Sequence, residues 1–253
     1  MSSTVLLERK GAVGIVTLNR PDRLNAMSTT LCRDLDQRLR EAAADAAIRV
    51  VVLTGAGRAF CAGDDLKEFG EQTATKVASI AHIEAIQACT RAMMQMDKLV
   101  IGALAGYAVG GGFEWLVNCD MVVAAEDLVA FFPEMEWGQF VTGGVTHLLP
   151  QAVGHQRAME LMVLGERQTA ADLHRLGLVN WVVPRAEMMA KAMAVAEAVA
   201  AKSAFSTSRL KRMLTGGIDD RLARAIAVEG SITIEAFGRP EAMERVARGF
   251  SRK

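Results

Sequence analysis

An apolar run that ends in three consecutive glycines constrains this chain more than any other stretch. Residues 100–109 read VIGALAGYAV, residues 110–112 are all glycine, and Glu114 follows two positions later. The run is typical of a buried strand, and the pattern after it predicts a helix that begins near Gly111 or Gly112. Such a strand, turn and helix N-terminus leave backbone N–H groups pointing outward at the positive end of a helix dipole. A ligand can then lie against the main chain, because glycine has no Cβ.

Two interpretations of this glycine turn are open at this point. The glycines could only let the helix pack tightly on the strand, with Glu114 as a favourable charge in the first turn. The turn could instead bind an anion. It lacks the Lys-Ser/Thr that ends a P-loop and the G-x-G-x-x-G spacing of a dinucleotide fold, so a nucleotide phosphate is a poor fit. A developing oxyanion is a better candidate.

Composition and charge argue against several protein classes. The chain has 253 residues, enough for one large domain, and 29 Lys+Arg balance 29 Asp+Glu. That balance disfavours partners such as nucleic acid or a membrane surface. The four cysteines form no CxxC pair and the four histidines form no ligand cluster, so no metal is expected. Without a signal peptide or an apolar run long enough to cross a bilayer, we expect a cytoplasmic protein with free thiols.

Strand-like runs alternate with helical patterns up to about residue 132, and helical patterns dominate afterwards. This order predicts an α/β fold with a parallel-strand core and a helical C-terminal part. Ser28 is expected to cap the first long helix. The predicted strands are 5–8, 13–18, 50–53, 100–109, 121–125, 129–132 and 178–183, and the predicted helices are 28–44, 77–96, 155–164, 170–176, 186–201, 206–214 and 221–237.

Five motifs together resemble the crotonase (enoyl-CoA hydratase/isomerase) superfamily. They occur in the order typical of that family and extend over nearly the whole chain. The motif at residues 59–67 is a loop of small residues between a strand and a helix, and it has the same local arrangement as the glycine turn. The motifs are residues 19–26 (NRPDRLNA), 59–67 (AFCAGDDLK), 105–114 (AGYAVGGGFE), 119–120 (CD) and 133–134 (PE), with a further signature from Ala171 through residues 177–184.

The resemblance implies a crotonase-like β-β-α spiral core in residues 1–195, which holds the CoA and catalytic site. It implies that residues 196–253 form a helical region that makes homotrimers, often paired into homohexamers. Phe237 and Phe250 in this region would contact another subunit or close over CoA. The implied substrate is an acyl-CoA thioester, with no metal or redox cofactor and with coenzyme A as part of the substrate.

The resemblance also assigns the residues of the site. By motif position, the backbone N–H groups of Asp64 and Gly111 form an oxyanion hole for the thioester oxygen. The side chain of Asp64 is then expected to point to solvent or to cap the following helix. Arg20, Arg23 and Lys67 supply positive charge for the CoA phosphates, unless they are ordinary surface charges. The residues expected to bind CoA and substrate are Arg23, Leu24, Ala26, Ala62, Asp65, Leu66 and Lys67.

Two glutamates decide which reaction the resemblance favours. Glu114 and Glu134 stand where the hydratases of the family carry their catalytic pair, and we expect them to titrate as a coupled pair. Glu114 would activate water, and Glu134 would deliver a proton to the α-carbon. Glu136 would face the same way as Glu134 if the segment is extended, although a surface ion pair is the simpler interpretation. His147 as a base is a weak hypothesis beside a packed or solvent-facing histidine.

Together these features predict an enoyl-CoA hydratase, or the same enzyme running the reverse dehydration. An enoyl-CoA isomerase, a hydratase-lyase and a catalytically silent CoA-binding or RNA-binding relative are the alternatives. After Gly138 the chain departs from the family pattern, because residues 139–148 read QFVTGGVTHL where a proline and a later glycine pair are usual. This loop lies near the acyl pocket in the family, so the sequence leaves the acyl group open.

Overall fold

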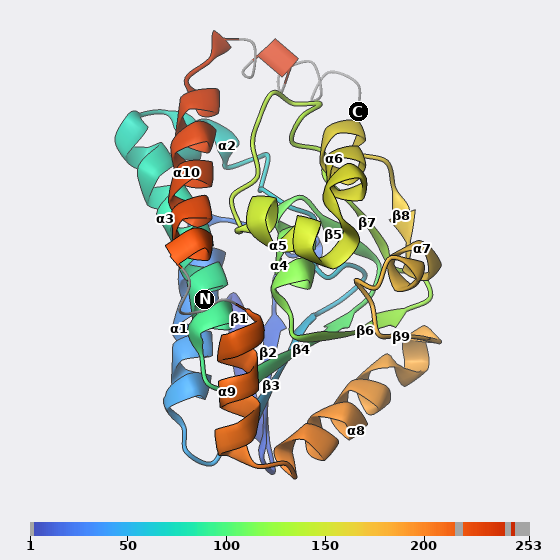
Figure 1. Cartoon of the computed structure of the whole chain (residues 1–253). Coiled ribbons are helices and arrows are strands. Elements are labelled where there is room, and N and C mark those ends of the chain that lie inside the picture. Colours follow the sequence, from blue (N-terminus) through green and yellow to red (C-terminus); the bar gives the residue numbers. More distant parts are fainter. Residues whose placement is uncertain (1–2, 216–219, 241–243, 246–253) are drawn as a thin grey trace.

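A computed structural model describes residues 3–215, 220–240 and 244–245 of the chain. Two β-sheets form its centre, and helices cover them on both sides (Figure 1). Within these residues no helix is both long and apolar enough to cross a membrane. The strands are β1 (Val5–Lys10), β2 (Val13–Leu18), β3 (Val50–Gly55), β4 (Leu99–Leu104), β5 (Tyr107–Val109), β6 (Met121–Ala125), β7 (Val129–Phe131), β8 (Gln168–Thr169) and β9 (Trp181–Val183).

The larger sheet has six strands in the order β1-β2-β3-β4-β6-β9. β1 and β2 form a hairpin, since they pair antiparallel, and all later neighbours in this sheet are parallel. Residues 50–54 of β3 are all buried, which is expected when both faces of a parallel sheet are covered. The parallel-strand core predicted from the sequence is therefore confirmed.

Helices α1 and α3 lie on one side of the larger sheet and α8 on the other (Figure 1). Ser28 caps α1 as predicted, because its hydroxyl accepts from Leu31 N at 3.0 Å. Two short helices, α2 and α5, have no counterpart among the predicted ranges. The helices are α1 (Thr29–Ala44), α2 (Phe69–Thr73), α3 (Lys76–Gln95), α4 (Gly111–Asn118), α5 (Val145–Val153), α6 (His155–Leu164), α7 (Ala170–Arg175), α8 (Met188–Ala200), α9 (Ala204–Leu214) and α10 (Asp220–Phe237), with 3₁₀ turns at Pro21–Arg23 and Arg185–Glu187.

The smaller sheet, in the order β5-β7-β8, corrects one sequence prediction. The run over residues 100–109 was predicted as one strand, but it forms β4 in the larger sheet and β5 in the smaller one. The chain turns at Gly106, which has φ +69°, and a Cβ there would lie 1.9 Å from Arg58 O. The helix start at Gly111 is confirmed. β4, β5 and α4 therefore make one β-β-α turn of the predicted spiral, and β6 and β7 begin the next.

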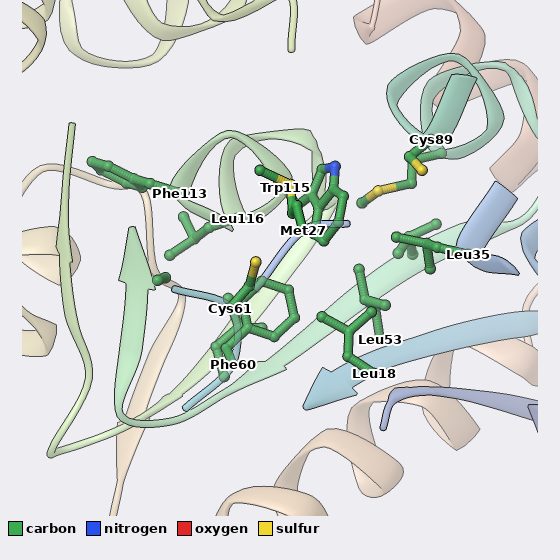
Figure 2. Close-up of a cluster of buried hydrophobic side chains, with 14 of the residues drawn as sticks. Leu18, Met27, Leu35, Leu53, Phe60, Cys61, Cys89, Phe113, Trp115 and Leu116 are labelled. Carbon is green, nitrogen blue, oxygen red and sulfur yellow. The ribbon is translucent and has the colours of Figure 1, made fainter. Parts of the chain in front are cut away.

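A hydrophobic core surrounds the side chains that follow the glycine turn on α4 (Figure 2). Phe113 and Trp115 of α4 are fully buried, and the ring of Phe113 stacks on Phe132 with centroids 4.4 Å apart. Phe60 and Cys61, from the loop after β3, pack into the same core. Both loops of the predicted oxyanion hole are thus anchored by large buried side chains next to them.

The C-terminal part is helical, as predicted. α10 packs along α3 (Figure 1), and Phe237 at its end contacts Phe69 edge to face with ring centroids 5.4 Å apart. The division of the chain at residues 195 and 196 stays a prediction, and α8 runs across that position. Phe250 lies outside the described residues.

Candidate active site

Backbone pairing places the two predicted oxyanion donors at equivalent positions on two adjacent chain segments. Cys61 and Ala108 form a parallel bridge, and Val109 N donates to Cys61 O at 2.9 Å. Asp64 and Gly111 each lie three residues beyond this bridge. The two loops therefore run side by side in register.

The hydrogen bonds around Asp64 set the direction of its N–H. Gly63 O accepts from Met27 N at 2.8 Å, and Asp65 N donates to Met27 O at 3.0 Å. In a trans peptide the C=O and the following N–H point in opposite directions. The N–H of Asp64 therefore points away from Met27. Gly111 is the first residue of α4, where a backbone N–H has no partner within the helix.

Glu114 lies behind the wall of the site, in the first turn of α4. Its side chain is 1% exposed, and it accepts hydrogen bonds from Thr142 N at 2.8 Å and Thr142 Oγ1 at 3.0 Å. A Cβ on Gly111 would lie 3.7 Å from Glu114 Oε2. Burial raises the pKa of Glu114 to about 8, despite the two hydrogen bonds from Thr142, which lower it.

Glu134 follows Pro133, and its carboxyl reaches the glycine turn. A Cβ on Gly110, whose φ is +54°, would lie 2.6 Å from Glu134 Oε1, so only glycine allows this approach. Glu134 Oε2 is buried and has no hydrogen-bond partner among the described residues. Burial, and then the charge of Glu114, hold the pKa of Glu134 well above its ordinary value.

A cavity of about 660 Å³ opens in front of these groups. Asp64, Gly110, Gly111, Glu134 and Thr142 line it, whereas Glu114 does not line it and lies next to Gly111 and Thr142. All seven residues predicted to bind CoA and substrate also line it. These are Arg23, Leu24, Ala26, Ala62, Asp65, Leu66 and Lys67.

The structure corrects the prediction for Arg20. Its guanidinium donates to Asp65 at 2.9 Å and to Glu68 at 3.2 Å, and only 16% of the side chain is exposed. Arg20 is thus engaged in an internal ion pair and is not among the residues that line the cavity, where contact with the CoA phosphates was expected. The pair also occupies the carboxylate of Asp65, which therefore contributes to the cavity wall without a free charge. Arg23 and Lys67 are exposed at the cavity rim.

Three further side-chain predictions have clear outcomes. Asp64 neither points freely to solvent nor caps a helix, because its carboxylate Oδ1 lies 3.2 Å from the buried His82 Nε2. Residues 134–138 form turns, so the extended geometry considered for Glu136 is wrong, and Glu136 is exposed at the cavity rim. His147 Nε2 on α5 lies 2.7 Å from Gln151 Nε2, and the residue does not line the cavity, in agreement with a packed or solvent-facing histidine.

Helix α10 holds the loop that carries Thr142. The carboxylate of Glu229 accepts from Gly144 N at 2.6 Å and from Thr146 N at 2.9 Å, and Thr233 Oγ1 donates to backbone oxygens of the loop. Glu229 is 1% exposed, and burial raises its pKa. Through this loop, α10 helps to position the hydrogen bonds on Glu114.

Several residues of the site were not identified from the sequence. Thr142 and His82 are in no motif, and only their three-dimensional contacts reveal them. Arg58 and Arg167 add two exposed cations to the cavity wall without a motif of their own. Asn25 belongs to a quoted motif, and its buried amide donates to Ala56 O and Ala59 O at 2.9 and 2.8 Å, which ties the loop of residues 19–26 to the loop after β3.

Metal-binding chemistry has no candidate among the described residues, since no three His, Cys, Asp or Glu side chains there are grouped to hold an ion. The four cysteines are free thiols. The cavity thus combines the two backbone N–H donors, the carboxyl of Glu134 with Glu114 behind its wall, and a rim that carries both cations and acids. Such a set can stabilise an oxyanion and transfer protons beside it.

Comparison with known proteins gives one consistent family. A family model described as enoyl-CoA hydratase/isomerase matches residues 8–249. A probable mitochondrial enoyl-CoA hydratase of Dictyostelium discoideum is 33% identical over 235 residues, which cover 93% of this chain and 83% of that protein. The crystal structure of an enoyl-CoA hydratase/isomerase from Mycobacterium paratuberculosis has a TM-score of 0.92 at 27% identity and covers 98% of this chain and 99% of that one. A monofunctional enoyl-CoA isomerase from M. smegmatis has a TM-score of 0.71 at 29% identity and covers 88% of this chain and 99% of that one.

Proposed function

The chain belongs to the enoyl-CoA hydratase/isomerase family, and we propose that within it the protein is a hydratase. It adds water to the double bond of a 2-enoyl-CoA to give a 3-hydroxyacyl-CoA, and it also catalyses the reverse dehydration. One observation carries this proposal. Two carboxyls with raised pKa values, the buried Glu114 and the half-buried Glu134, lie beside the N-terminus of α4, where a thioester oxygen would meet the N–H groups of Asp64 and Gly111.

In the proposed mechanism the thioester oxygen accepts hydrogen bonds from the N–H groups of Asp64 and Gly111. Ionised Glu114 takes a proton from water, and the water oxygen forms a bond to the β-carbon. The electron pair of the double bond moves toward the thioester, and the oxygen gains the charge of an enolate. Glu134, protonated at the start, then gives its proton to the α-carbon. Removal of one oxyanion donor typically costs about 3–4 kcal/mol of barrier.

The raised pKa values support this division of roles. Two carboxyls that interact in a buried site cannot both ionise at neutral pH without a large cost, so one keeps a proton. The hydrogen bonds from Thr142 lower the pKa of Glu114, whereas Glu134 Oε2 has no such partner among the described residues. Glu114 is therefore the better base and Glu134 the better acid.

Isotope labelling separates hydration from isomerisation. The protein is incubated with 2-butenoyl-CoA, and in parallel with 3-butenoyl-CoA, in water enriched in oxygen-18. A hydratase incorporates the label at the β-carbon of the 3-hydroxyacyl product. An isomerase converts the 3-enoyl substrate and leaves no label, and that result would refute the proposal. A lyase would release a shorter aldehyde or acyl product, and a silent CoA-binding protein would convert neither substrate.

The proposed assembly is a homotrimer or homohexamer, and the proposed compartment is the cytoplasm. α9 supports the assembly, because it exposes large apolar side chains that an oligomer would cover. Light scattering at several protein concentrations tests this, and a monomer at every concentration would contradict it. The exposed apolar side chains of α9 are Phe205, Leu210, Met213 and Leu214.

A further inference from the structure

A buried histidine lies directly behind the predicted oxyanion hole. His82 belongs to α3 and is 1% exposed. Its Nε2 lies 3.2 Å from Asp64 Oδ1, and its Nδ1 lies 3.0 Å from Thr29 Oγ1 at the start of α1. Both ring nitrogens therefore have a partner, and the three residues form a chain that links α1, α3 and the loop after β3.

The chemistry of the partners fixes how the protons are arranged. An ionised carboxylate only accepts hydrogen bonds, so His82 must carry a proton on Nε2. In the neutral ring Nδ1 is then an acceptor, and the hydroxyl of Thr29 donates to it. With a neutral ring, the hydrogen bonds run in one direction, from Thr29 through His82 to Asp64.

Asp64 presents two opposing groups to the active site. Its N–H is placed to stabilise an enolate, but its carboxylate is an anion that would repel one. The side chain is 21% exposed, and Asp64 lines the cavity. Without a partner, rotation about χ1 would allow the carboxylate to approach the thioester oxygen.

We propose that His82, itself held by Thr29, is a positioning residue that keeps the Asp64 carboxylate out of the oxyanion hole. The role rests on the proposed function, because it matters only if the Asp64 N–H binds the thioester oxygen. A residue without a charged side chain at position 64 would not need the histidine. The proposal thus predicts that the effect of changing His82 depends on whether position 64 carries a carboxylate.

The two glutamates give an independent reason to restrain this carboxylate. The charge of Asp64 contributes to the raised pKa values of both Glu114 and Glu134. If the Asp64 carboxylate moved closer to them, it would oppose the ionisation of Glu114, which water activation requires. Loss of the His82 contact would therefore impair both the oxyanion hole and the base.

A double-mutant cycle tests the proposal on hydration of 2-butenoyl-CoA. His82→Asn removes the N–H group that His82 Nε2 directs at Asp64. We expect kcat to fall by about tenfold, which corresponds to about 1.4 kcal/mol of barrier. KM should change by less than about twofold. His82→Gln places an amide nitrogen near the Nε2 position, and it should recover most of kcat. In an Asp64→Ala background, His82→Asn should change kcat by less than about twofold.

Two controls separate this role from general support of the fold. Ser79 is buried one turn earlier on α3, so Ser79→Ala should alter thermal stability without altering kcat. All variants are compared by thermal unfolding. The proposal is refuted if His82→Asn lowers kcat by the same factor with and without the Asp64 carboxylate. It is equally refuted if Asp64→Ala abolishes activity, because the carboxylate itself would then be catalytic.

An infrared measurement keeps this inference separable from the hydratase proposal. Acetyl-CoA labelled with carbon-13 at its carbonyl has no double bond to hydrate, and its C=O stretch reports how strongly the oxyanion donors polarise it. Binding to the wild type should lower the stretching frequency, and His82→Asn should weaken that shift while His82→Gln restores it. An unchanged shift in His82→Asn would refute the role of His82 even if the protein hydrates no enoyl-CoA.

Discussion

Glu114 is predicted to lower the stability of the protein at the pH where it is needed for catalysis. Its ordinary pKa of 4.5 rises to about 8 in the folded protein, mainly through burial. Between these values the folded state binds more protons than the unfolded state, so the free energy of unfolding falls as the pH rises. Each pKa unit corresponds to about 1.4 kcal/mol, which gives a ceiling on the order of 4–5 kcal/mol at pH 8 and above.

The substitution Glu114→Gln removes this cost and keeps the shape of the side chain. The amide oxygen can still accept from Thr142 N, and the amide nitrogen can donate to Thr142 Oγ1. After allowance for water penetration and local relaxation, we expect the variant to exceed the wild type by about 2–4 kcal/mol at pH 8. At about pH 5, near the ordinary pKa, the difference should shrink to within about 1 kcal/mol.

Urea unfolding followed by tryptophan fluorescence at pH values from about 5 to 8 measures this difference. The protomer concentration must be constant, because assembly contributes to apparent stability. Glu136→Gln, an exposed glutamate at the cavity rim, is the matched control and should change stability by less than about 0.5 kcal/mol at every pH. Parallel stability curves for the wild type and Glu114→Gln would refute the reasoning. The stabilised variant should be a poor hydratase, as expected when the buried carboxyl that lowers stability is also the catalytic base.

Four other predictions follow from the site. Glu134→Gln should lower kcat for hydration by about 10²–10⁴-fold, with KM nearly unchanged, and full activity would exclude it as the proton donor. Gly110→Ala should lower kcat and reduce the free energy of unfolding in urea by about 1–2 kcal/mol, because a Cβ at φ +54° would meet Glu134 Oε1. Wild-type kinetics in this variant would contradict that contact. Thr142→Val removes a hydrogen bond that lowers the pKa of Glu114, so the acid limb of the kcat–pH profile should move to higher pH, and an unmoved limb would count against Glu114 as the base. Lys67→Ala should raise KM for acyl-CoA by about 3–10-fold without changing kcat, an effect that salt should reduce; an unchanged KM would remove Lys67 from the CoA site.

Local signals in the sequence predicted the parts of the fold that depend on neighbouring residues. Ser28 followed by an amphipathic pattern located the cap of α1, and the glycines located the start of α4. The separate strand β5 was not predicted, because only pairing with β7 distinguishes it from β4. The turn at Gly106 lies inside a continuous apolar run, so no change of composition marks it.

The family motifs predicted where the site lies in the chain. They did not predict the side-chain contacts within it. Arg20 has the charge that a CoA phosphate needs, but its guanidinium is paired with Asp65 and Glu68, which lie 45 and 48 residues later in the chain. His82 lies 18 residues from Asp64 in a different element, and Thr142 lies 28 residues from Glu114. Such contacts depend on how helices and loops pack together, which one sequence does not encode in a local pattern.

The bridge between Cys61 and Ala108 makes the active site sensitive to chain length. Both proposed oxyanion donors are main-chain groups three residues beyond that bridge, so the length of each segment sets their spacing. Deletion of one residue from either three-residue segment would move a donor by about 3.3 Å, far beyond the range of a hydrogen bond. We therefore expect these two segments to tolerate no insertion or deletion. Changes of acyl specificity are expected instead from side-chain substitutions in the loop of residues 139–144 and in α10, which leave the two donors in place.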